Sequence, residues 1–323
     1  MTKACIAAVS YHLPDKVETN NELIDEMQLS WSDDDIFQKT GIKQRHVVTD
    51  ECASDLGEAA ARKLFASYSD LLDKIDYLIF CSQSPDYTLP ATACILQERL
   101  GLKNSCAAMD INQGCSGFIY GVSTAKALIE TGIATNVLLI TAETYSKYMD
   151  KMDKSTRTIF GDGAAATWIT GCDSETDKIT GIVLGTNGAG RNNLIVPNSG
   201  ARKDEVASNH LFMDGPEIFQ FTLLTIPKMV KEILSKVEMG IDDIDYFIFH
   251  QANAFILEHL RKKLKIPADK FCVDMEKIGN TVSASIPIVL KRAMDRNEIC
   301  SGMKVMLVGF GVGYSWGGCV VEI

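Results

Sequence analysis

The chain alternates short, uninterrupted apolar runs with longer segments of helical periodicity. Four of these runs lie at residues 77–80, 137–140, 246–249 and 305–308. Apolar runs without polar alternation are typical of strands covered on both faces, so the pattern predicts an α/β fold. The apolar residues up to Tyr11 are expected to form a first strand and not a signal peptide. Two polar stretches, residues 30–35 and 197–209, are predicted to be surface loops, the second long enough to cover the mouth of a site.

The apolar pattern repeats between the two parts of the chain. Residues 75–80 and 244–249 are identical at five of six positions, and related segments follow at 96–102 and 260–266. Asp110 then corresponds to Asp274, and Val137 to Val305, in the same order. An ordered series of matches predicts a duplicated unit, with an N-terminal half at residues 1–172 and a C-terminal half at 173–323. Because no flexible linker separates the halves, we expect one rigid unit.

Composition and charge argue against several classes of protein. The 323 residues are 46% hydrophobic, which suits a large buried core, and the net charge is −10. That charge argues against nucleic acid or an anionic membrane as a partner. No apolar stretch approaches the roughly eighteen residues of a transmembrane helix. The ten cysteines are scattered without CxxC pairs, so we expect a reducing, cytoplasmic setting with neither disulfides nor a metal site.

One cysteine stands at a predicted turn from a strand into a helix. Gly114 and Gly117 flank Cys115, and the following helix has little polar face before Gly132. Unpaired N–H groups and the positive end of the helix dipole favour a thiolate at such a position. Cys115 is therefore a candidate nucleophile, although a buried structural cysteine is the alternative for this residue taken alone.

A histidine and an asparagine are candidate partners of that cysteine. His250 ends the apolar run at 246–249, and Asn280 lies in another turn that enters a helix. Taken singly, a satisfied core histidine and a helix-capping asparagine are the alternatives. The repeat places Cys115 opposite Gly279, next to Asn280, so packing of the halves about a pseudo-twofold axis would bring the two residues together.

The three residue types together favour carbon–carbon bond formation. Condensation with a malonyl thioester needs a soft nucleophile to carry the acyl group, as well as two neutral hydrogen-bond donors where the enolate charge develops. Cysteine, histidine and asparagine supply these groups. A hydrolase would instead need a histidine polarised by aspartate to activate water.

At these residues the sequence resembles β-ketoacyl-ACP synthase III, the FabH-type condensing enzymes, along nearly its whole length. The matching segments are residues 39–46, 114–118, 160–165, 250–253, 279–281 with 285–287, and 309–313 with 316–317. Each is weak alone, but the ordered set is specific. The resemblance implies a thiolase-like five-layer αβαβα fold built from two duplicated halves, and a homodimer. It also implies CoA and ACP thioesters as substrates, with no cofactor.

The same resemblance assigns roles to single residues. By the family pattern Cys115 is acylated from acyl-CoA, while His250 and Asn280 polarise the malonyl thioester during decarboxylation. The backbone N–H groups of Cys115 and Val312 form the oxyanion hole. The family usually has glycine at the second position; the backbone donor survives the change, although valine resists a positive φ. Further substrate-binding positions implied are Lys39, Thr40, Leu89, Lys154, Phe160, Gly215 and Asn253.

Several departures from the family pattern concern the CoA and carrier contacts. Where the family commonly stacks a tryptophan on the CoA adenine, the chain has Asp35, and Trp31 lies four residues earlier as a candidate replacement. Lys39 and Lys154 replace arginines that meet the CoA phosphates, which keeps the charge but loses the bidentate fork. Phe255 replaces an arginine that docks the carrier protein.

The helix after Asn253 is expected to expose Phe255 opposite its buried leucines. Phe255 is either part of an altered carrier contact or a scattered surface aromatic. The basic run over residues 261–265 either attracts an acidic carrier protein or is a solvated charge run. Leu89, at a position that the family contributes across the dimer interface, replaces the commoner phenylalanine and favours a roomier acyl pocket, with Phe160 as a second wall.

The leading hypothesis is that a short acyl-CoA and malonyl-ACP give β-ketoacyl-ACP with loss of carbon dioxide. One alternative is a specialised homologue of a secondary or surface-glycan pathway that transfers an acyl group without decarboxylation. A non-catalytic dimer partner is disfavoured by the presence of Cys115, His250 and Asn280 together. Thiolase proper is disfavoured because it needs a second catalytic cysteine, and Cys319 lies in a C-terminal strand.

Overall fold

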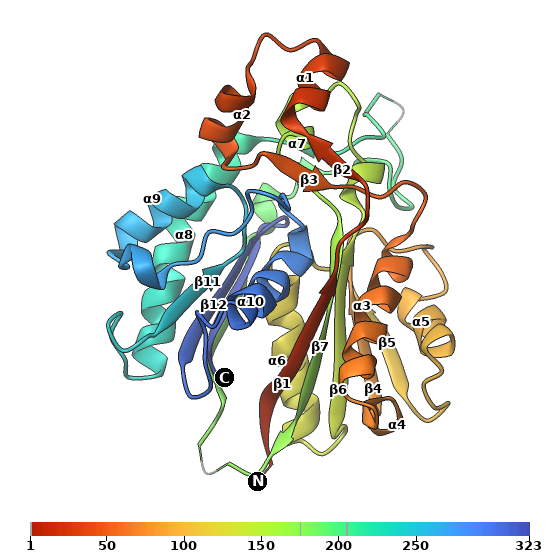
Figure 1. Cartoon of the computed structure of the whole chain (residues 1–323), viewed down its shortest axis with the longest axis vertical. Coiled ribbons are helices and arrows are strands. Elements are labelled where there is room, and N and C mark those ends of the chain that lie inside the picture. The colour runs from red at the N-terminus through yellow and green to blue at the C-terminus, as the bar shows by residue number, and fades with distance from the viewer. Residues whose placement is uncertain (1, 175, 205) are drawn as a thin grey trace.

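Two mixed β-sheets form the framework of the protein. The computed structural model describes residues 2–174, 176–204 and 206–323 (Figure 1). The first sheet has the order β1-β7-β6-β4-β5, and the second the order β11-β12-β13-β8. Their strands are β1 (Lys3–His12), β4 (Tyr77–Cys81), β5 (Ala107–Ile111), β6 (Asn136–Glu143), β7 (Gly163–Cys172), β8 (Ile179–Thr186), β11 (Tyr246–Phe249), β12 (Lys304–Gly311) and β13 (Ser315–Glu322). Two small ribbons pair β2 (Val17–Thr19) with β3 (Gln44–His46) and β9 (Leu194–Ile195) with β10 (Phe212–Met213).

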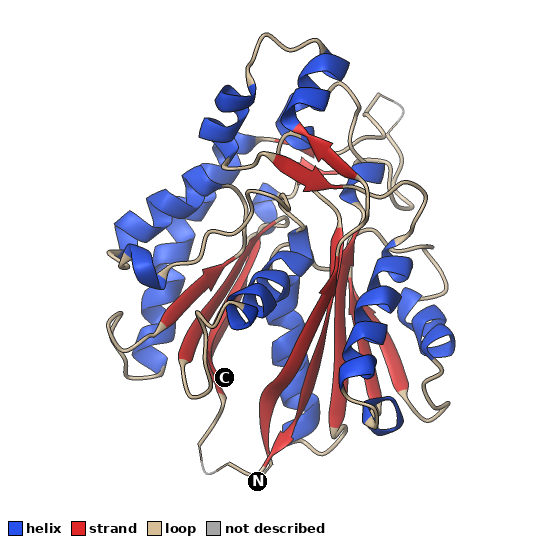
Figure 2. Cartoon of the chain, in the orientation of Figure 1, coloured by secondary structure: helices blue, strands red, loops and turns tan. Residues whose placement is uncertain are grey.

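Helices separate and cover the two sheets. Helices α3 (Ala53–Ser67) and α5 (Thr92–Leu100) pack on the outer face of the first sheet, and α8 (Gly215–Lys236) and α9 (Ala254–Leu264) cover the second. Between the sheets lie α6 (Gly117–Glu130) and α10 (Ser285–Asp295), which contact strands of both (Figures 1 and 2). These layers are the predicted five-layer αβαβα fold, which is confirmed.

The remaining helices are short and lie mainly in connections. They are α1 (Asn20–Met27), α2 (Asp33–Thr40), α4 (Leu71–Lys74) and α7 (Lys154–Arg157), with 3₁₀ turns at Tyr145–Lys147, Gly188–Gly190, Ala268–Lys270 and Val282–Ala284. Figure 1 shows α1, α2, β2 and β3 above the ends of the two sheets, at the opposite side from the N-terminus. Among the described residues, none of the helices has both the length and the apolar character needed to span a membrane.

The two sheets share a common plan. In the first, Tyr77 of β4 pairs in parallel with Val137 of β6; in the second, Tyr246 of β11 pairs in parallel with Val305 of β12. These are the positions that the sequence repeat matched. A parallel bridge from Phe247 to Phe271 takes the place that β5 has in the first sheet. The proposed boundary at residue 172 falls at the end of β7 and stays a prediction.

Sequence patterns explain where the central helix lies. Phe118, Ile119, Val122 and Ala125 leave α6 with little polar face, and all four are fully buried because a sheet packs on each side. The predicted strand, turn and helix around Cys115 are confirmed, and the helix ends before Gly132, whose φ is +76°.

One predicted loop is wrong in part. Residues 30–35 were expected to be loop, but α2 begins at Asp33. Ser32 caps the helix by accepting a hydrogen bond from the Asp35 N–H, and the Asp35 carboxylate accepts one from the Ser32 N–H. The aspartates thus stabilise a helix N-terminus. In the second predicted loop, residues 197–204 and 206–209 contain neither helix nor strand, as expected.

Candidate active site

Cys115 lies in the tight turn between β5 and α6, where the chain has little room. The turn is closed by a hydrogen bond from the Gly117 N–H to the Gly114 carbonyl. A Cβ atom at Gly114 would lie 2.3 Å from Gln83 Oε1, and one at Gly117 would lie 2.4 Å from Cys81 Sγ. Both glycines are therefore needed for close packing at the start of the helix.

Strand β12 passes directly against the cysteine. A Cβ atom at Gly311 would lie 2.7 Å from Cys115 Cβ and 2.9 Å from its sulfur. The next residue is Val312, and the backbone N–H groups of Val312 and Cys115 act to lower the pKa of the thiol. The positive φ of the C-terminal glycine loop, 130°, falls on Gly313, so Val312 keeps an ordinary backbone conformation.

Burial dominates the acidity of the nucleophile. Cys115 is 4% exposed, and burial, assisted by the charge of Glu143, raises the pKa of its thiol to about 12. The two backbone N–H groups act in the opposite direction but are outweighed. The preference for thiolate expected from the helix start is therefore not realised in the substrate-free chain, and the resting form is the thiol.

His250 follows β11 and is held at both ends. Its backbone N–H donates to the Val308 carbonyl at 2.7 Å, and its Nδ1 lies 2.7 Å from Ser285 Oγ. Burial lowers the pKa of His250 to about 3, against a smaller opposing effect of a hydrogen bond with the Val282 backbone. The imidazole is therefore neutral at physiological pH.

Asn280 is fixed by its neighbours in the turn before α10. Its Oδ1 accepts a hydrogen bond from the Val282 N–H at 2.9 Å, and its Nδ2 donates to the Ala252 carbonyl at 3.3 Å. This leaves one amide hydrogen of Asn280 for another acceptor. Val282 has a φ of +52°, which is a strained conformation for a β-branched residue, and such strain gathers at functional sites.

Cys115, His250 and Asn280 line one cavity of about 90 Å³. The three residues come from the β5–α6 turn, the end of β11 and the turn before α10. Because β4, β5, β6, β11 and β12 run parallel within their sheets, the site lies where their carboxyl ends meet, as in other α/β proteins. The structure thus brings together the three candidate catalytic residues.

The other predicted positions fall into different places. Phe160, Gly215 and Asn253 line the same cavity, and Asn253 also caps α9 through the Ile256 N–H. Thr40 is buried, and its hydroxyl donates to the Ile36 carbonyl at the end of α2, outside the cavity. Leu89 is 81% exposed and lies outside this cavity. The substrate contacts of these residues stay predictions.

The two lysines of the expected CoA contact meet at one aromatic ring. Lys39 Nζ lies 5.0 Å from the centre of the Trp31 ring, and Lys154 Nζ lies 4.5 Å from it. Both contacts are within the range of cation–π interactions. Trp31, from the segment before α2, and α7 therefore lie together, although they are far apart in the sequence.

A second cavity, of about 260 Å³, adjoins the other side of the cysteine turn. Leu194 lines both cavities, and Val312 and Gln83, which crowd the Gly114 backbone, line the second. Tyr145 and Leu211 in its wall belong to the same buried cluster as Cys115. Sequence reasoning missed this cavity, because its wall comes from five separate connections.

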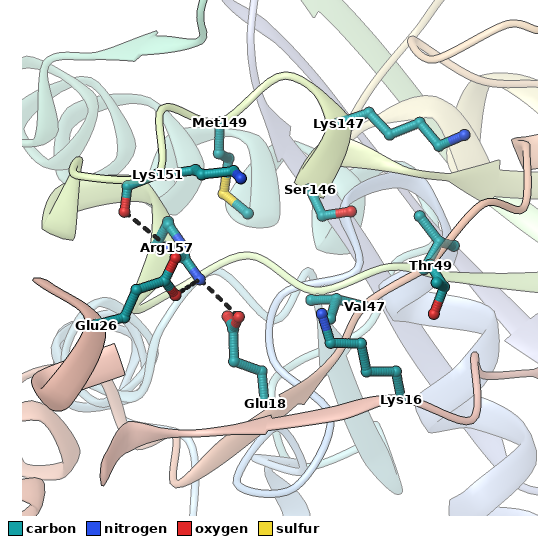
Figure 3. Close-up of a pocket in the computed structure, with 11 residues that line it drawn as sticks. Lys16, Glu18, Glu26, Val47, Thr49, Ser146, Lys147, Met149, Lys151 and Arg157 are labelled. Atoms are coloured by element: carbon teal, nitrogen blue, oxygen red, sulfur yellow. Dashed lines mark hydrogen bonds and ion pairs between the residues drawn. The ribbon is translucent and has the colours of Figure 1, made fainter. Parts of the chain in front are cut away.

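A larger depression of about 380 Å³ is not a comparable site (Figure 3). Its central cation, Arg157, is already paired with Glu18 at 2.6 Å and Glu26 at 2.9 Å. Lys147 and Lys151 lie near its edge in Figure 3. None of the three candidate catalytic residues lines it.

A buried carboxyl group behind the site was also missed. Glu143 ends β6 and accepts hydrogen bonds from the Ser283 hydroxyl at 2.7 Å, the Ser84 hydroxyl at 2.9 Å and the Gln83 N–H. Burial raises its pKa to about 8. It thus joins the loop after β4 to the turn that holds Asn280. A charged residue three positions after the apolar run at 137–140 was the available signal.

The fold and the site define a class of protein. Two duplicated sheets in five layers, with a cysteine at the start of a central helix facing neutral hydrogen-bond donors, are the architecture of thiolase-like condensing enzymes. Two family models match the chain: 3-oxoacyl-[acyl-carrier-protein (ACP)] synthase III over residues 109–188, and its C-terminal part over residues 234–323.

Individual relatives agree over the full length. β-Ketoacyl-[acyl-carrier-protein] synthase III of Clostridium acetobutylicum is 35% identical, with 100% of this chain and 99% of the relative covered. That of Caldanaerobacter subterraneus is 37% identical, covering 99% of this chain and 97% of the relative. A crystal structure of a 3-oxoacyl-(acyl-carrier-protein) synthase III is 44% identical with a TM-score of 0.95, over 99% of this chain and 100% of the other. The Pseudomonas aeruginosa enzyme is 31% identical with a TM-score of 0.92, covering 99% and 98%. The chain belongs to the β-ketoacyl-ACP synthase III family of acyltransferases.

Proposed function

We propose that this enzyme transfers an acyl group from acyl-CoA to Cys115 and condenses it with malonyl-ACP to give β-ketoacyl-ACP. The observation that carries the proposal is the convergence of Cys115, His250 and Asn280 on one buried cavity. Both substrates are thioesters, so the chemistry assigned to these side chains requires no cofactor.

In the first half-reaction the sulfur of Cys115 attacks the thioester carbonyl of acyl-CoA. A carbon–sulfur bond to the enzyme forms, the bond to CoA breaks, and the thiol proton leaves with CoA as its thiol. We assign stabilisation of the oxyanion of the tetrahedral intermediate to the N–H groups of Cys115 and Val312, both of which also favour the ionised form of the sulfur. Because the resting thiol is protonated, its proton has to leave as the attack proceeds, and it ends on the departing sulfur of CoA.

In the second half-reaction malonyl-ACP loses carbon dioxide, and the electron pair of the broken bond forms an enolate. Its carbon attacks the acyl group, and the Cys115 sulfur leaves and regains a proton. His250 and Asn280 donate hydrogen bonds to the enolate oxygen. When the Ser285 hydroxyl donates to Nδ1 of His250, the hydrogen of the neutral ring is on Nε2, which is the tautomer that this role requires.

We assign the nucleotide end of CoA to Trp31, Lys39 and Lys154. Their cation–π contacts place an aromatic face and two positive charges together, which suits an adenine and its phosphates. Asp35, at the position where the family has its tryptophan, is occupied in capping α2.

We assign the carrier contact to the start of α9. Phe255 is 51% exposed and lies against Phe219 and His259, with ring centres 5.4 and 4.2 Å apart. The exposed Lys262 is on the same helix. An exposed aromatic group beside positive charge suits a carrier protein with an acidic surface that also offers an apolar contact.

We further propose a homodimer in the cytoplasm. Strand β5 is at an edge of the first sheet, with β4 as its one neighbour among the described residues, and such edges are usually covered. The exposed Leu89 is suited to reach a partner subunit. The ten free cysteines are typical of a reducing compartment.

The test uses variants of each half-reaction with purified malonyl-ACP and short acyl-CoA donors. We expect Cys115→Ala to abolish acylation of the protein, and His250→Ala to retain acylation but lose condensation and release of carbon dioxide. Cys319→Ala, at another buried cysteine far from the cavity, is the matched control and should retain both steps. Equal loss of both steps in His250→Ala would contradict the assignment of roles, and acyl transfer without release of carbon dioxide would contradict the condensing reaction.

A further inference from the structure

Two cavities lie close to Cys115, and we assign a different substrate group of the reaction to each. The smaller one holds His250 and Asn280, so the malonyl thioester has to occupy it during decarboxylation. The acyl group on the sulfur must lie elsewhere at that moment, because both groups cannot fill about 90 Å³ together. The second cavity shares Leu194 with the smaller one and has a larger volume, about 260 Å³, so it is the neighbouring space to which we assign the acyl group.

The wall of the second cavity is polar where an acyl chain would end. Tyr145 is buried, and its hydroxyl donates to Gln83 Oε1 at 2.7 Å. Within the described residues, Gln83 Nε2 and the Tyr148 hydroxyl have no protein hydrogen-bond partner, and both residues are partly exposed, so water reaches these groups. The two tyrosine rings pack edge to face with centres 6.4 Å apart, and both tyrosines and Gln83 line the cavity. Asn112 and Arg191 lie at the exposed end.

The polar groups in the wall of the second cavity are not required for the fold, whereas the hydrogen bonds of Glu143 are. The Gln83 backbone N–H already binds Glu143, which fixes the loop after β4 independently of the Gln83 side chain. A cavity for a purely hydrocarbon chain would leave the free amide hydrogens of Gln83 without an acceptor, at a cost of about 1–3 kcal/mol once water is displaced. The lining therefore favours a ligand that supplies a hydrogen-bonding oxygen.

We propose that the acyl group carried by Cys115 is a short hydroxyacyl group, whose hydroxyl accepts from Gln83 Nε2 and donates to a tyrosine oxygen of this cavity. The inference rests on the proposed function and specifies its donor substrate. A site that hydrogen-bonds a substrate hydroxyl discriminates strongly against the analogue without it, whereas an apolar pocket discriminates weakly in the other direction. Gln83 and Tyr145 are thus specificity-determining residues of the acylation step.

The test measures the rate at which Cys115 is acylated, by intact-protein mass spectrometry, with 3-hydroxybutyryl-, 4-hydroxybutyryl-, butyryl- and acetyl-CoA. We expect one of the hydroxybutyryl donors to react at least tenfold faster than butyryl-CoA. Tyr145→Phe and Gln83→Met should each lower that ratio at least fivefold, because they remove a polar partner at nearly constant volume. Leu211→Met, an apolar change in the wall of the second cavity but outside the smaller one, is the matched control and should leave the ratio within twofold.

The outcomes separate this inference from the proposed function. The inference is overturned if butyryl-CoA reacts as fast as or faster than both hydroxybutyryl donors. It is also overturned if neither Tyr145→Phe nor Gln83→Met changes the ratio of the two rates. In both cases acylation of Cys115 would still support the proposed function. Absence of acylation at Cys115 with every donor would overturn both.

Discussion

Replacement of Ser285 by alanine tests whether the tautomer of His250 is set by one hydroxyl group. Ser285 Oγ lies 2.7 Å from His250 Nδ1, and both residues are buried. Without the hydroxyl, Nδ1 loses its donor, and the ring is free to carry its hydrogen there and not on Nε2. Ser285→Ala should therefore impair the step that needs a donor from Nε2, which is condensation, more than acylation of Cys115.

The magnitude follows from what the ring loses. A buried hydrogen-bonding group left without its partner costs about 1–3 kcal/mol. At 1.36 kcal/mol per factor of ten, this corresponds to roughly a 5- to 150-fold loss in kcat for condensation. Acylation should change by less than about threefold, because the cysteine, its backbone donors and the second cavity are unchanged.

The assay follows both half-reactions and stability in parallel. Acylation is followed by intact mass, condensation by release of carbon dioxide, and folding by thermal unfolding. Ser10→Ala is the control, because Ser10 Oγ is also buried and donates at 2.7 Å, but to the Ala60 carbonyl far from the site. If Ser285→Ala loses no more condensation activity than Ser10→Ala, or loses acylation to the same extent, the hydroxyl does not set the tautomer.

Three further predictions concern binding and pH. Trp31→Ala should raise KM for acetyl-CoA about fivefold, as expected for loss of about 1 kcal/mol, but leave KM for acetyl-pantetheine unchanged; a rise for both would refute the nucleotide contact. Because burial lowers the pKa of His250 to about 3, kcat for condensation between pH 7 and 5 should show no decline from protonation of this histidine, and a single titration near pH 6.5 would contradict this. Burial raises the pKa of Glu143 from 4.5 to about 8, so its stabilising contribution is complete below about pH 4.5 and lost as pH rises towards 8. In chemical denaturation, Glu143→Gln should therefore show a smaller fall in the free energy of unfolding between pH 5 and 8 than the unchanged protein, and an identical fall would show that the carboxyl is already charged.

The sequence predicted the α/β class and the place of the nucleophile because both depend on local patterns. Apolar runs without alternation mark strands covered on two faces, and all four runs became strands: β4, β6 and β12 lie inside their sheets, and β11 pairs with β12 at the end of the second sheet. Glycines at 114 and 117 mark a turn too tight for side chains. In the structure, a side chain at these positions would collide with Gln83 and Cys81, respectively. The internal repeat also placed Asn280 near Cys115, since duplicated units that pack about a twofold axis bring equivalent turns together.

Features that depend on contacts between residues far apart in the sequence could not be predicted from local patterns. Gln83 and Tyr145 are separated by 62 positions in the sequence, and the bond between them exists because β4 and β6 are neighbours in the sheet. Ser285 was part of a matching segment, but its partner, His250, follows β11 and is 35 positions away in the sequence. The acidity of Cys115 was misjudged for the same reason: the helix start is visible in the sequence, whereas the depth of burial is not.

The error at residues 30–35 has a local cause. A cluster of aspartates is polar enough to suggest a loop, yet Ser32 followed three residues later by Asp35 is a capping pattern. The helix is short and amphipathic, with Ile36 buried against the rest of the domain, so its few apolar residues gave a weak periodic signal.

The glycines of β12 limit which substitutions this enzyme can accept. A methyl group at Gly311 would lie within contact distance of both the β-carbon and the sulfur of Cys115, and one at Gly309 would lie 2.8 Å from the Cys115 carbonyl oxygen. Positions 309 and 311 can therefore carry no side chain without moving the reactive cysteine. Evolution or engineering of new donor preferences should instead change residues on the other walls of the two cavities.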